Sequence, residues 1–347
     1  MSEKDYSGVT TSKIGKNARA SSTSNKQKLE ISKSKKEDKS QDSQEVSLTK
    51  EQIENYKKAG KIATQIKAYA LQIIKPELKL SEIAEKIEAK IVELGGEVGF
   101  PVNLSKNEIA AHYTPTLRAD EVTEGLLKVD IGVQVKGCIC DFAFPIDLTA
   151  DKKYLNLIKA SNEALKNAVE IVKKNKSKTK INEIGKTIKE TIEKYSFSPI
   201  RNLSGHSLSE YMVHAGITIP NYDNNNTKEL GEGAFAIEPF ATNGSGIVKD
   251  GQGSSIYHIS KSLGQPRDNF AREVLAWLIE TKKTLPFSQR EVERKFGSRA
   301  LFALRNLAQA GLIEEYSLLI EQNKGIVSQS ETSIIIHDNQ VEVLVEA

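Results

Sequence analysis

Two separated segments repeat one pattern, and this internal repeat constrains the fold more than any other feature. Residues 80–105 (LSEIAEKIEAKIVELGGEVGFPVNLS) and 181–204 (INEIGKTIKETIEKYSFSPIRNLS) hold isoleucines in the same register, and both end in Pro and then Asn-Leu-Ser. Each copy follows another helical pattern, at 50–74 and 152–175, and precedes strand-like residues. The repeat predicts a pseudo-twofold α+β domain with one sheet and helices on its outer face, although two amphipathic helices can also look alike by chance.

Two aspartates, Asp130 and Asp141, interrupt the apolar stretch KVDIGVQVKGCICDFAF (128–144). Val and Ile alternate with other residues on both sides of Lys136-Gly137, which predicts two strands joined by a two-residue hairpin loop. In that register Asp130 lies opposite Ala143, so the two carboxylates are diagonal neighbours on one face. Buried adjacent carboxylates must share a proton, meet a basic partner or hold cations. The alternative is that both lie in solvent, one at a turn and one at a strand end.

The composition is that of a soluble protein. A chain of 347 residues can bury a large core, and a net charge of +3 is too balanced to indicate nucleic-acid binding. Because no apolar run is long enough to cross a membrane and no secretion signal stands at the start, we expect a cytoplasmic protein without a membrane partner. We also expect a monomer. Cys138 and Cys140 alternate in one strand and are poorly placed for a disulfide, so reduced thiols are expected, while a metal role stays open.

The chain begins with a polar segment. Residues 1–46 are rich in Ser, Lys, Asp and Glu, which predicts a disordered tail. Its lysines could contact an acidic surface such as ribosomal RNA, or the tail could simply solubilise the chain. Thr49-Lys50-Glu51-Gln52 is a capping-box pattern, so ordered structure is expected to begin there with a helix.

A change of pattern after Gly253 predicts an insert in the main domain. Residues 261–322 contain three short helical patterns, which indicate a small winged-helix-like subdomain. Because it has no concentrated basic stripe, packing or a pocket wall is a better interpretation than nucleic-acid binding. The main domain then comprises residues 47–260 and 323–347, the second part being predicted to form strands.

Five further polar residues stand in distinctive settings. His112 occurs in AAHYTP, His206 in SGHSL and His214 in MVHAG, each beside small residues that allow close approach of backbone or ligand. Glu238 in GAFAIEPF and Glu331 in VSQSETSIII interrupt apolar strands. Taken singly, each is more often an ordinary structural residue.

The order of these motifs resembles a known family. FPVNLS, AAHYTP, VDIGVQVKGCICD, NLSGHSL, VHAGI and FAIEPFAT, followed by a glutamate in a late strand, closely resemble methionine aminopeptidases of type 2, particularly archaeal ones, in metallopeptidase family M24. The resemblance covers the chain from about residue 50 to its end. It implies the pita-bread (creatinase/aminopeptidase) fold. It also implies removal of the initiator methionine before a small second residue, by attack of a metal-bridging hydroxide on the peptide carbonyl.

The resemblance also implies roles for the matching residues. Two divalent metal ions, Co, Mn, Fe or Zn, would be held by Asp130, Asp141, His206, Glu238 and Glu331, with Asp141 and Glu331 bridging them. Glu238 would also shuttle the proton, and His112 and His214 would contact the substrate near the scissile bond. The methionine pocket would include Phe100, Val213, His214 and Tyr316, of which the two aromatics could equally be core residues. Four carboxylates and one imidazole suit two divalent cations on charge alone.

One departure from the family pattern and two alternative functions stay open. Thr332-Ser333 follow Glu331 where family members commonly carry His. An X-Pro peptidase of the same fold has similar ligands, but such enzymes usually carry a folded N-terminal domain. A non-catalytic relative that binds RNA or ribosomes would lack metal ligands, and none is missing here. The expected partners of the enzyme are nascent polypeptide N-termini, with ribosome contact through the tail as a further possibility.

Overall fold

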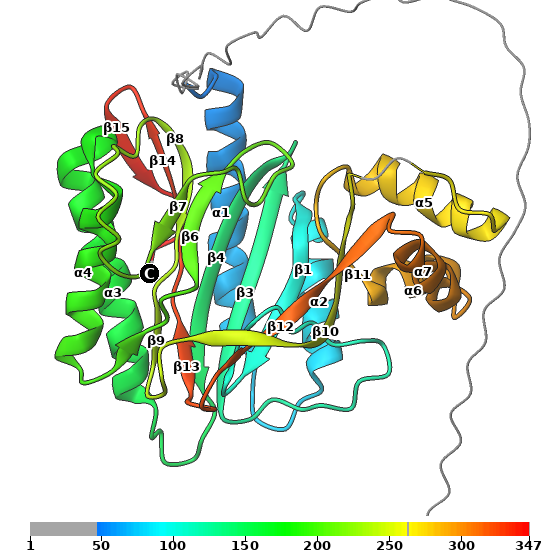
Figure 1. Cartoon of the computed structure of the whole chain (residues 1–347), viewed down its shortest axis with the longest axis horizontal. Helices are drawn as coiled ribbons and strands as arrows, with labels where there is room; N and C mark the ends of the chain where they lie inside the picture. The colour runs from blue at the N-terminus through cyan, green and yellow to red at the C-terminus, as the bar shows by residue number, and fades with distance from the viewer. Residues whose placement is uncertain (1–46, 262–263, 347) are drawn as a thin grey trace, which may run out of the picture. The chain divides into compact units, whose positions relative to one another are not determined.

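The computed structural model describes residues 47–261 and 264–346 (Figure 1). The predicted disordered tail, residues 1–46, lies outside the described residues. The first half of the fold contains two helices and four strands: α1 (Lys50–Ile73), α2 (Leu80–Glu93), β1 (Glu97–Lys106), β2 (Ile109–Ala111), β3 (Leu126–Val135) and β4 (Cys138–Asp147). None of the helices in these described ranges is long and apolar enough to cross a membrane.

The second half begins with another pair of helices. Its elements are α3 (Leu155–Asn175), the 3₁₀ turn η1 (Lys176–Lys178), α4 (Ile181–Lys194), β5 (Ser198–Pro199), β6 (Ser204–Leu208), β7 (Thr218–Pro220), β8 (Gly233–Ile237) and β9 (Phe240–Thr242). The remaining elements are β10 (Val248–Ile259), α5 (Asn269–Lys282), β11 (Phe287–Ser288), α6 (Gln289–Phe296), α7 (Ala300–Gln309), β12 (Ile313–Glu321), β13 (Val327–Gln329), β14 (Thr332–His337) and β15 (Gln340–Val343).

Local sequence signals account for the helix pairs. The Thr49 side chain accepts a hydrogen bond from the Gln52 backbone and the Gln52 side chain accepts one from Thr49, so the predicted capping box is confirmed. The predicted repeat is confirmed as well: α2 and α4 are both 14 residues long. Their matched isoleucines are buried, namely Ile83, Ile87, Ile91, Ile184, Ile188 and Ile192.

The predicted hairpin has the expected register. β3 and β4 are joined by Lys136-Gly137, and Asp130 is the Cα partner of Ala143. β1 adds to β3, giving a three-stranded sheet in the order β1-β3-β4. The second half forms a five-stranded sheet in the order β15-β14-β8-β6-β7. The two sheets are joined where the backbones of Ala143 and Glu331 exchange hydrogen bonds of 2.9 and 3.3 Å.

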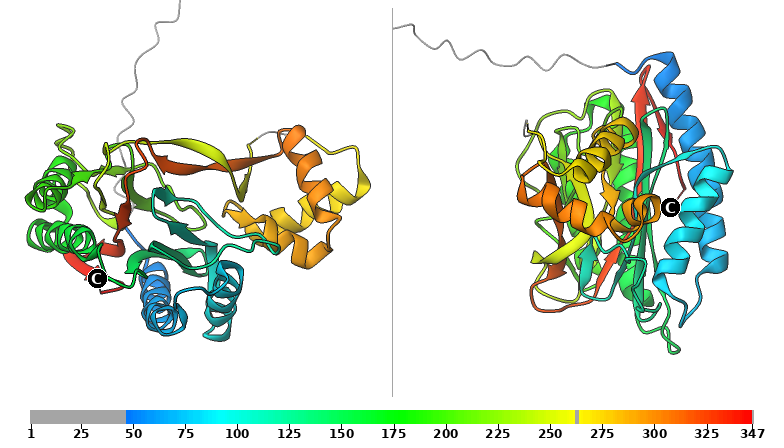
Figure 2. Two further views of the ribbon diagram at one scale, coloured as in Figure 1. Left: turned by 90° about the horizontal axis from the view of Figure 1, so that it is seen from below. Right: turned by 90° about the vertical axis from the view of Figure 1, so that its right-hand side faces the viewer.

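Each pair of helices covers its own sheet. α1 and α2 pack against β1, β3 and β4, and bury one hydrophobic core between them. α3 and α4 pack against strands of the second half over a separate core that includes residues of β8 and β14. Figure 2 shows the two pairs side by side on the outer side of the sheets. The pseudo-twofold layering therefore places the helices outside and leaves the inner face of the strands for a site.

The helices α5, α6 and α7 lie between β10 and β12 in the chain and share a hydrophobic core of their own (Figure 1). β10 and β12 pair along most of their length, and β12 also pairs with β2 of the first half. The helical insert is thus held on a two-stranded arm that continues from the main body. The division into residues 47–260 and 323–347 on one side and 261–322 on the other stays a prediction.

Candidate metal centre

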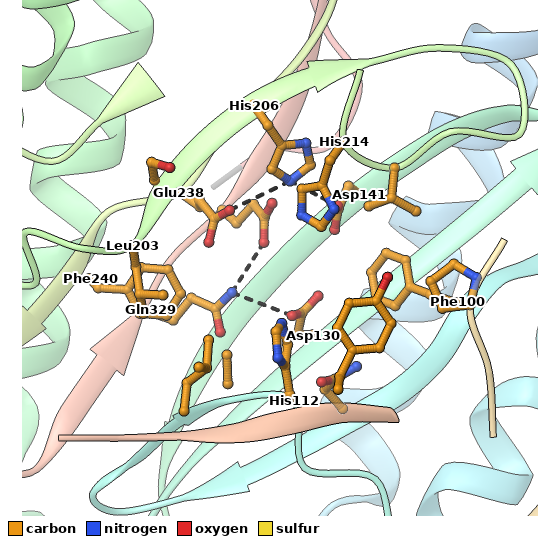
Figure 3. A pocket seen from close by; sticks show the side chains of 18 of the residues that line it. Phe100, His112, Asp130, Asp141, Leu203, His206, His214, Glu238, Phe240 and Gln329 are labelled. Atoms are coloured by element: carbon orange, nitrogen blue, oxygen red, sulfur yellow. Dashed lines mark hydrogen bonds and ion pairs between the residues drawn. The ribbon is translucent and has the colours of Figure 1, made fainter. Parts of the chain in front are cut away.

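One cavity of about 350 Å³ is lined by all ten side chains that the sequence singled out. They are Phe100, His112, Asp130, Asp141, His206, Val213, His214, Glu238, Tyr316 and Glu331. Figure 3 shows the carboxylates in the middle, with His206 and His214 on one side and His112 on the opposite side. Residues that are two hundred positions apart in the chain therefore face one another.

Five strands position the five candidate metal ligands. Asp130 and Asp141 come from the β3–β4 hairpin of the first half, with their side chains on one face as the register predicts. His206 lies on β6, and Glu238 follows β8. Glu331 precedes β14, at the backbone pair with Ala143 that joins the two sheets. Both halves thus contribute ligands, and the site lies at their junction.

The ligand atoms are close enough to share ions. One ligand atom each of Asp141, His206 and Glu331 lies within 4.8 Å of the other two. His206 Nε2 is 3.7 Å from Asp141 Oδ2 and 3.5 Å from Glu238 Oε1. Its Nδ1 faces the carbonyl oxygen of Ser207 at 3.4 Å, an arrangement that leaves the Nε2 lone pair toward the acids.

The electrostatics of the cavity favour cations. Burial raises the pKa of Asp130 to about 7. Burial and then the neighbouring acids raise the pKa values of Asp141, Glu238 and Glu331 well above their usual range. Burial, followed by His214, lowers the pKa of His206 to about 3, so this imidazole is neutral and cannot balance the acids. No lysine or arginine is among the described residues that line the cavity.

Unpartnered oxygens show that the residues fit bound metal. Asp130 Oδ1, Asp141 Oδ1 and Glu331 Oε1 are buried and have no hydrogen-bond partner. Buried polar atoms of this kind are costly unless a ligand or water satisfies them. Oxygen-rich sets with one imidazole are typical ligands of divalent cations such as Mn, Fe or Co. The donor set and its unsatisfied atoms therefore agree with the bound metal that the family resemblance implies.

Sequence reasoning missed the residues that support these ligands. Gln329 Nε2 donates to Glu331 Oε2 at 3.2 Å and lies 3.5 Å from Asp130 Oδ2 (Figure 3). Ser333 Oγ accepts from the Asp141 backbone N–H and donates to the Asp141 carbonyl oxygen, each at 2.8 Å. The signal in the sequence for Gln329 and Ser333 is the alternation of side chains along a strand. Both lie two positions from Glu331, so they face the same side as that ligand. Thr332 follows Glu331 at the position where family members commonly carry His. Its hydroxyl donates to the Val345 carbonyl oxygen.

The two other histidines differ in their surroundings. His112 Nδ1 lies 3.1 Å from the carbonyl oxygen of Ser317, which requires the proton on Nδ1 and leaves Nε2 as an acceptor. Burial lowers its pKa, so the neutral form prevails. Its ring meets that of Tyr316 at 5.4 Å between centroids. His214 is exposed at the mouth of the cavity, with its ring centroid 4.4 Å from that of His206.

Apolar side chains form much of the remaining wall. Phe100, Val213 and Tyr316, predicted from the sequence, are joined by residues that it did not indicate: Leu203, Ile217, Phe240, Ile256, Pro286 and Leu319. Pro286 lies between α5 and β11, so the helical insert contributes to the wall. Phe100 packs onto Gly132, where an added Cβ would come within 2.4 Å of the ring. The cavity therefore combines a polar centre with apolar walls.

Comparisons with known proteins place this geometry in context. Residues 54–262 match the model of "Metallopeptidase family M24". A methionine aminopeptidase of Methanocaldococcus jannaschii is 41% identical over 300 residues, covering 84% of this chain and 99% of that protein. Among solved structures, a thermophilic Arx1 has a TM-score of 0.72 at 16% identity, covering 86% of this chain and 92% of that one. Methionine aminopeptidase from Rickettsia prowazekii has a TM-score of 0.59 at 17% identity, covering 86% and 98%. At such identities these structures show similarity of fold alone.

Proposed function

Since the chain belongs to metallopeptidase family M24, we propose that the cavity at the junction of its two halves is the active site of a methionine aminopeptidase. The chain has the pita-bread fold of that family. It is a hydrolase that removes the N-terminal methionine from proteins and peptides. The observation that carries the proposal for the site is the convergence of four acids and one imidazole around unpartnered oxygens, beside an apolar wall.

Two divalent metal ions serve as cofactors, and Asp130, Asp141, His206, Glu238 and Glu331 would hold them. When bound, the ions supply Lewis acidity for the carbonyl group and lower the pKa of water. The four carboxylates would balance the charge of both ions. Gln329 would hold Asp130 and Glu331 in place through its amide, as a support for the ligands.

Side chains around the ligands would manage protons and orientation. Glu238 combines a position at the ligand cluster with a raised pKa caused by burial, so it can accept a proton and return it to the leaving amine. His112, with its proton committed to Ser317, would accept a hydrogen bond from the scissile amide N–H. His214 can turn an N–H toward the carbonyl oxygen, where negative charge develops in the transition state.

The apolar wall would select the substrate. Phe100, Val213 and Tyr316, with the other apolar residues of the wall, offer a surface for an unbranched, polarizable side chain such as that of methionine. Beyond the scissile bond, the wall formed by the insert would restrict the second residue to small side chains. The curated relative of 41% identity is named methionine aminopeptidase, so an X-Pro peptidase is not favoured.

Partners and location follow from this activity as further proposals. The substrates would be the N-termini of nascent polypeptides, encountered in the cytoplasm. Contact with ribosomes through residues 1–46 stays a prediction, because that tail lies outside the described residues. The monomeric state is likewise still a prediction.

Peptide hydrolysis tests the proposal directly. The protein, loaded with Mn²⁺ or Co²⁺, should release methionine from Met-Ala-Ser and not cleave Ala-Pro. Release should fall when the second residue grows, in the series Met-Gly-Ser, Met-Val-Ser and Met-Leu-Ser. An absence of methionine release with every divalent metal would overturn the assignment, and preferential cleavage of Ala-Pro would replace it with an X-Pro peptidase.

A further inference from the structure

Arg290 is a fully buried cation that the proposed reaction does not use. It lies in α6 of the helical insert, with 2% of its surface exposed, and its guanidinium contacts residues of the main body. Nη2 donates to Glu88 Oε1 of α2 at 2.5 Å. Nη1 donates to Thr114 Oγ1 at 3.2 Å and to the carbonyl oxygen of Pro115. An arginine is rarely buried so completely unless its charge is paired and hydrogen-bonded.

These contacts form a closed network. Thr114 Oγ1 donates to the Val102 carbonyl oxygen at 2.9 Å, and the Val102 backbone N–H donates to Glu88 Oε1 at 3.2 Å. Four segments of the chain meet in it: α2, β1, the residues that follow β2, and α6. Glu88, Val102, Thr114 and Arg290 each bond to two others of this set, so a shift of one disturbs the rest.

The network lies next to two proposed substrate contacts. Val102 follows Phe100 by two residues in β1, and Thr114 follows His112 by two residues. His112 has a φ of +71°, a left-handed conformation that L side chains rarely adopt. Such a backbone persists only where its surroundings fix it. On one side of it Ala111 pairs with Leu319 of β12, and on the other the Tyr113 carbonyl oxygen accepts from the Leu104 backbone of β1. The Ser317 carbonyl oxygen meets its ring, and the Arg290 contacts add further anchors at Thr114 and Pro115.

We propose that Arg290 is a positioning residue, through which the helical insert holds the His112 loop and β1 in the geometry that the reaction needs. The inference rests on the proposed function, since it assigns Arg290 to the same site without contact with substrate. A planar guanidinium can reach Glu88 with one amino group and the Thr114-Pro115 pair with the other. A lysine ammonium is a single point and cannot satisfy both sides. The insert is therefore part of the machinery that orients the site, in addition to forming its wall.

A pair of matched double variants tests this role. Glu88→Gln/Arg290→Met removes the buried charge pair together, so no lone charge is left, and the amide oxygen can still accept from Val102. Glu85→Gln/Arg294→Met is the control: it breaks the other ion pair between α2 and α6, which is more exposed and does not contact the His112 loop. Both are compared with the unmodified protein at saturating Mn²⁺.

The measurements separate positioning from mere folding. For Glu88→Gln/Arg290→Met we expect a kcat on Met-Ala-Ser at least about tenfold lower, with a smaller change in KM, because a misplaced His112 weakens contacts that strengthen in the transition state. Hydrogen–deuterium exchange should accelerate at residues 112–116, while Mn²⁺ affinity by calorimetry stays unchanged. The control should match the unmodified protein in all three measurements.

Several outcomes would overturn the inference. A kcat within about twofold of the control, or unchanged exchange at residues 112–116, would show that Arg290 only packs the insert. If the double variant does not fold, Arg290→Lys, which keeps the charge beside Glu88, is expected to fold with the same loss of kcat, and full activity in it would overturn the inference. Failure of the unmodified protein to release methionine would instead reject the proposed function. Hydrogen–deuterium exchange at residues 112–116 would still show whether Arg290 orders the His112 loop.

Discussion

Two kinds of buried acid in this molecule show how surroundings decide what a carboxylate does. Glu321, at the end of β12, is fully buried and accepts hydrogen bonds at both oxygens. The backbone and hydroxyl of Ser245 donate to Oε1 at 2.5 and 2.6 Å, and the backbones of Asn323 and Gly325 donate to Oε2 at 2.7 and 2.8 Å. Asp130 and Asp141, by contrast, have unpartnered oxygens. The first kind of acid holds loops together, and the second kind is ready for a cation.

The Glu321 carboxylate gives a pH-dependent prediction. Burial alone would raise its pKa, but the hydrogen bonds from Ser245, Gly325 and Asn323 lower it below the usual range. A lowered folded pKa contributes stability above the unfolded value of about 4.3, and that stability is lost as pH falls through the folded pKa. Glu321→Gln should therefore lower the free energy of unfolding by about 2 kcal/mol at pH 7, and by less at pH 3. Urea unfolding at both pH values measures the difference.

An exposed glutamate is the control for this experiment. Glu190 of α4 is exposed and forms a long ion pair with Lys186, at 3.9 Å, so Glu190→Gln should change stability by less than about 0.5 kcal/mol at either pH. A loss in Glu321→Gln that is the same at pH 3 and pH 7 would contradict the role given to the ionised form.

At the scale of residues, the candidate metal ligands could be predicted from the sequence, but the buried polar residues that hold the site and its loops in place could not. The five candidate ligands could be proposed because each stands in a motif that resembles the family. Gln329, Arg290 and Glu321 were not found, because their partners are distant in sequence and nothing near them in the chain marks a buried polar group. In the sequence, Arg290 looks like any charged residue on the exposed face of a helix. Its burial depends on how α6 packs against α2, which only the folded chain determines.

The two copies of the repeated helix show a difference at the scale of elements. Ala84 of α2 and Gly185 of α4 occupy equivalent positions in the repeat, and both are buried. A Cβ added at Gly185 would lie 2.2 Å from the Tyr222 carbonyl oxygen and 2.6 Å from that of Pro220. The glycine thus allows α4 to approach the backbone around the end of β7 closely, although glycine disfavours the interior of a helix.

Gly185→Ala should therefore be destabilising, against the direction of helix propensity. Propensity alone predicts a gain of about 1 kcal/mol. The added methyl group must displace backbone oxygens, so we expect a net loss of roughly 1–3 kcal/mol, measured by urea unfolding. The matched variant Ala84→Gly should follow propensity and lose about 1 kcal/mol or somewhat more, since a buried methyl group goes too. A Gly185→Ala protein more stable than the unmodified one would show that the contact with β7 is loose.

The elements themselves were predictable where the signals are local. The capping box at Thr49, the repeated helices and the Lys136-Gly137 hairpin each follow from neighbouring residues, and the structure confirms them. The order β15-β14-β8-β6-β7 was not predictable from such signals, because its strands come from distant parts of the chain. The same holds for the backbone pair of Ala143 and Glu331, which joins the two sheets and carries a ligand into the site.

At the scale of the whole molecule, the candidate metal centre connects the two halves of the repeat. Asp130 and Asp141 belong to the first half, while His206, Glu238 and Glu331 lie beyond it in the chain. Neither half alone provides a complete set, and the two halves already share part of the core beneath α1 and α2, where residues of β6, β8 and β14 pack. Ions bound by both halves should therefore stabilise the fold as a unit, in addition to serving the reaction.

Metal removal tests this connection. Anything that binds the folded state adds RT ln(1 + [L]/Kd) to its stability, about 2.7 kcal/mol at a hundred times Kd. For a unit of this size, Mn²⁺ should raise the unfolding temperature over the EDTA-treated protein by about 5 °C. Asp141→Asn, which removes the acid implied to bridge the ions, should remain folded, lose methionine release, and show little or no rise with Mn²⁺. Equal stabilisation and turnover in this variant would mean that Asp141 is not a ligand, and that the two halves meet there for structural reasons only.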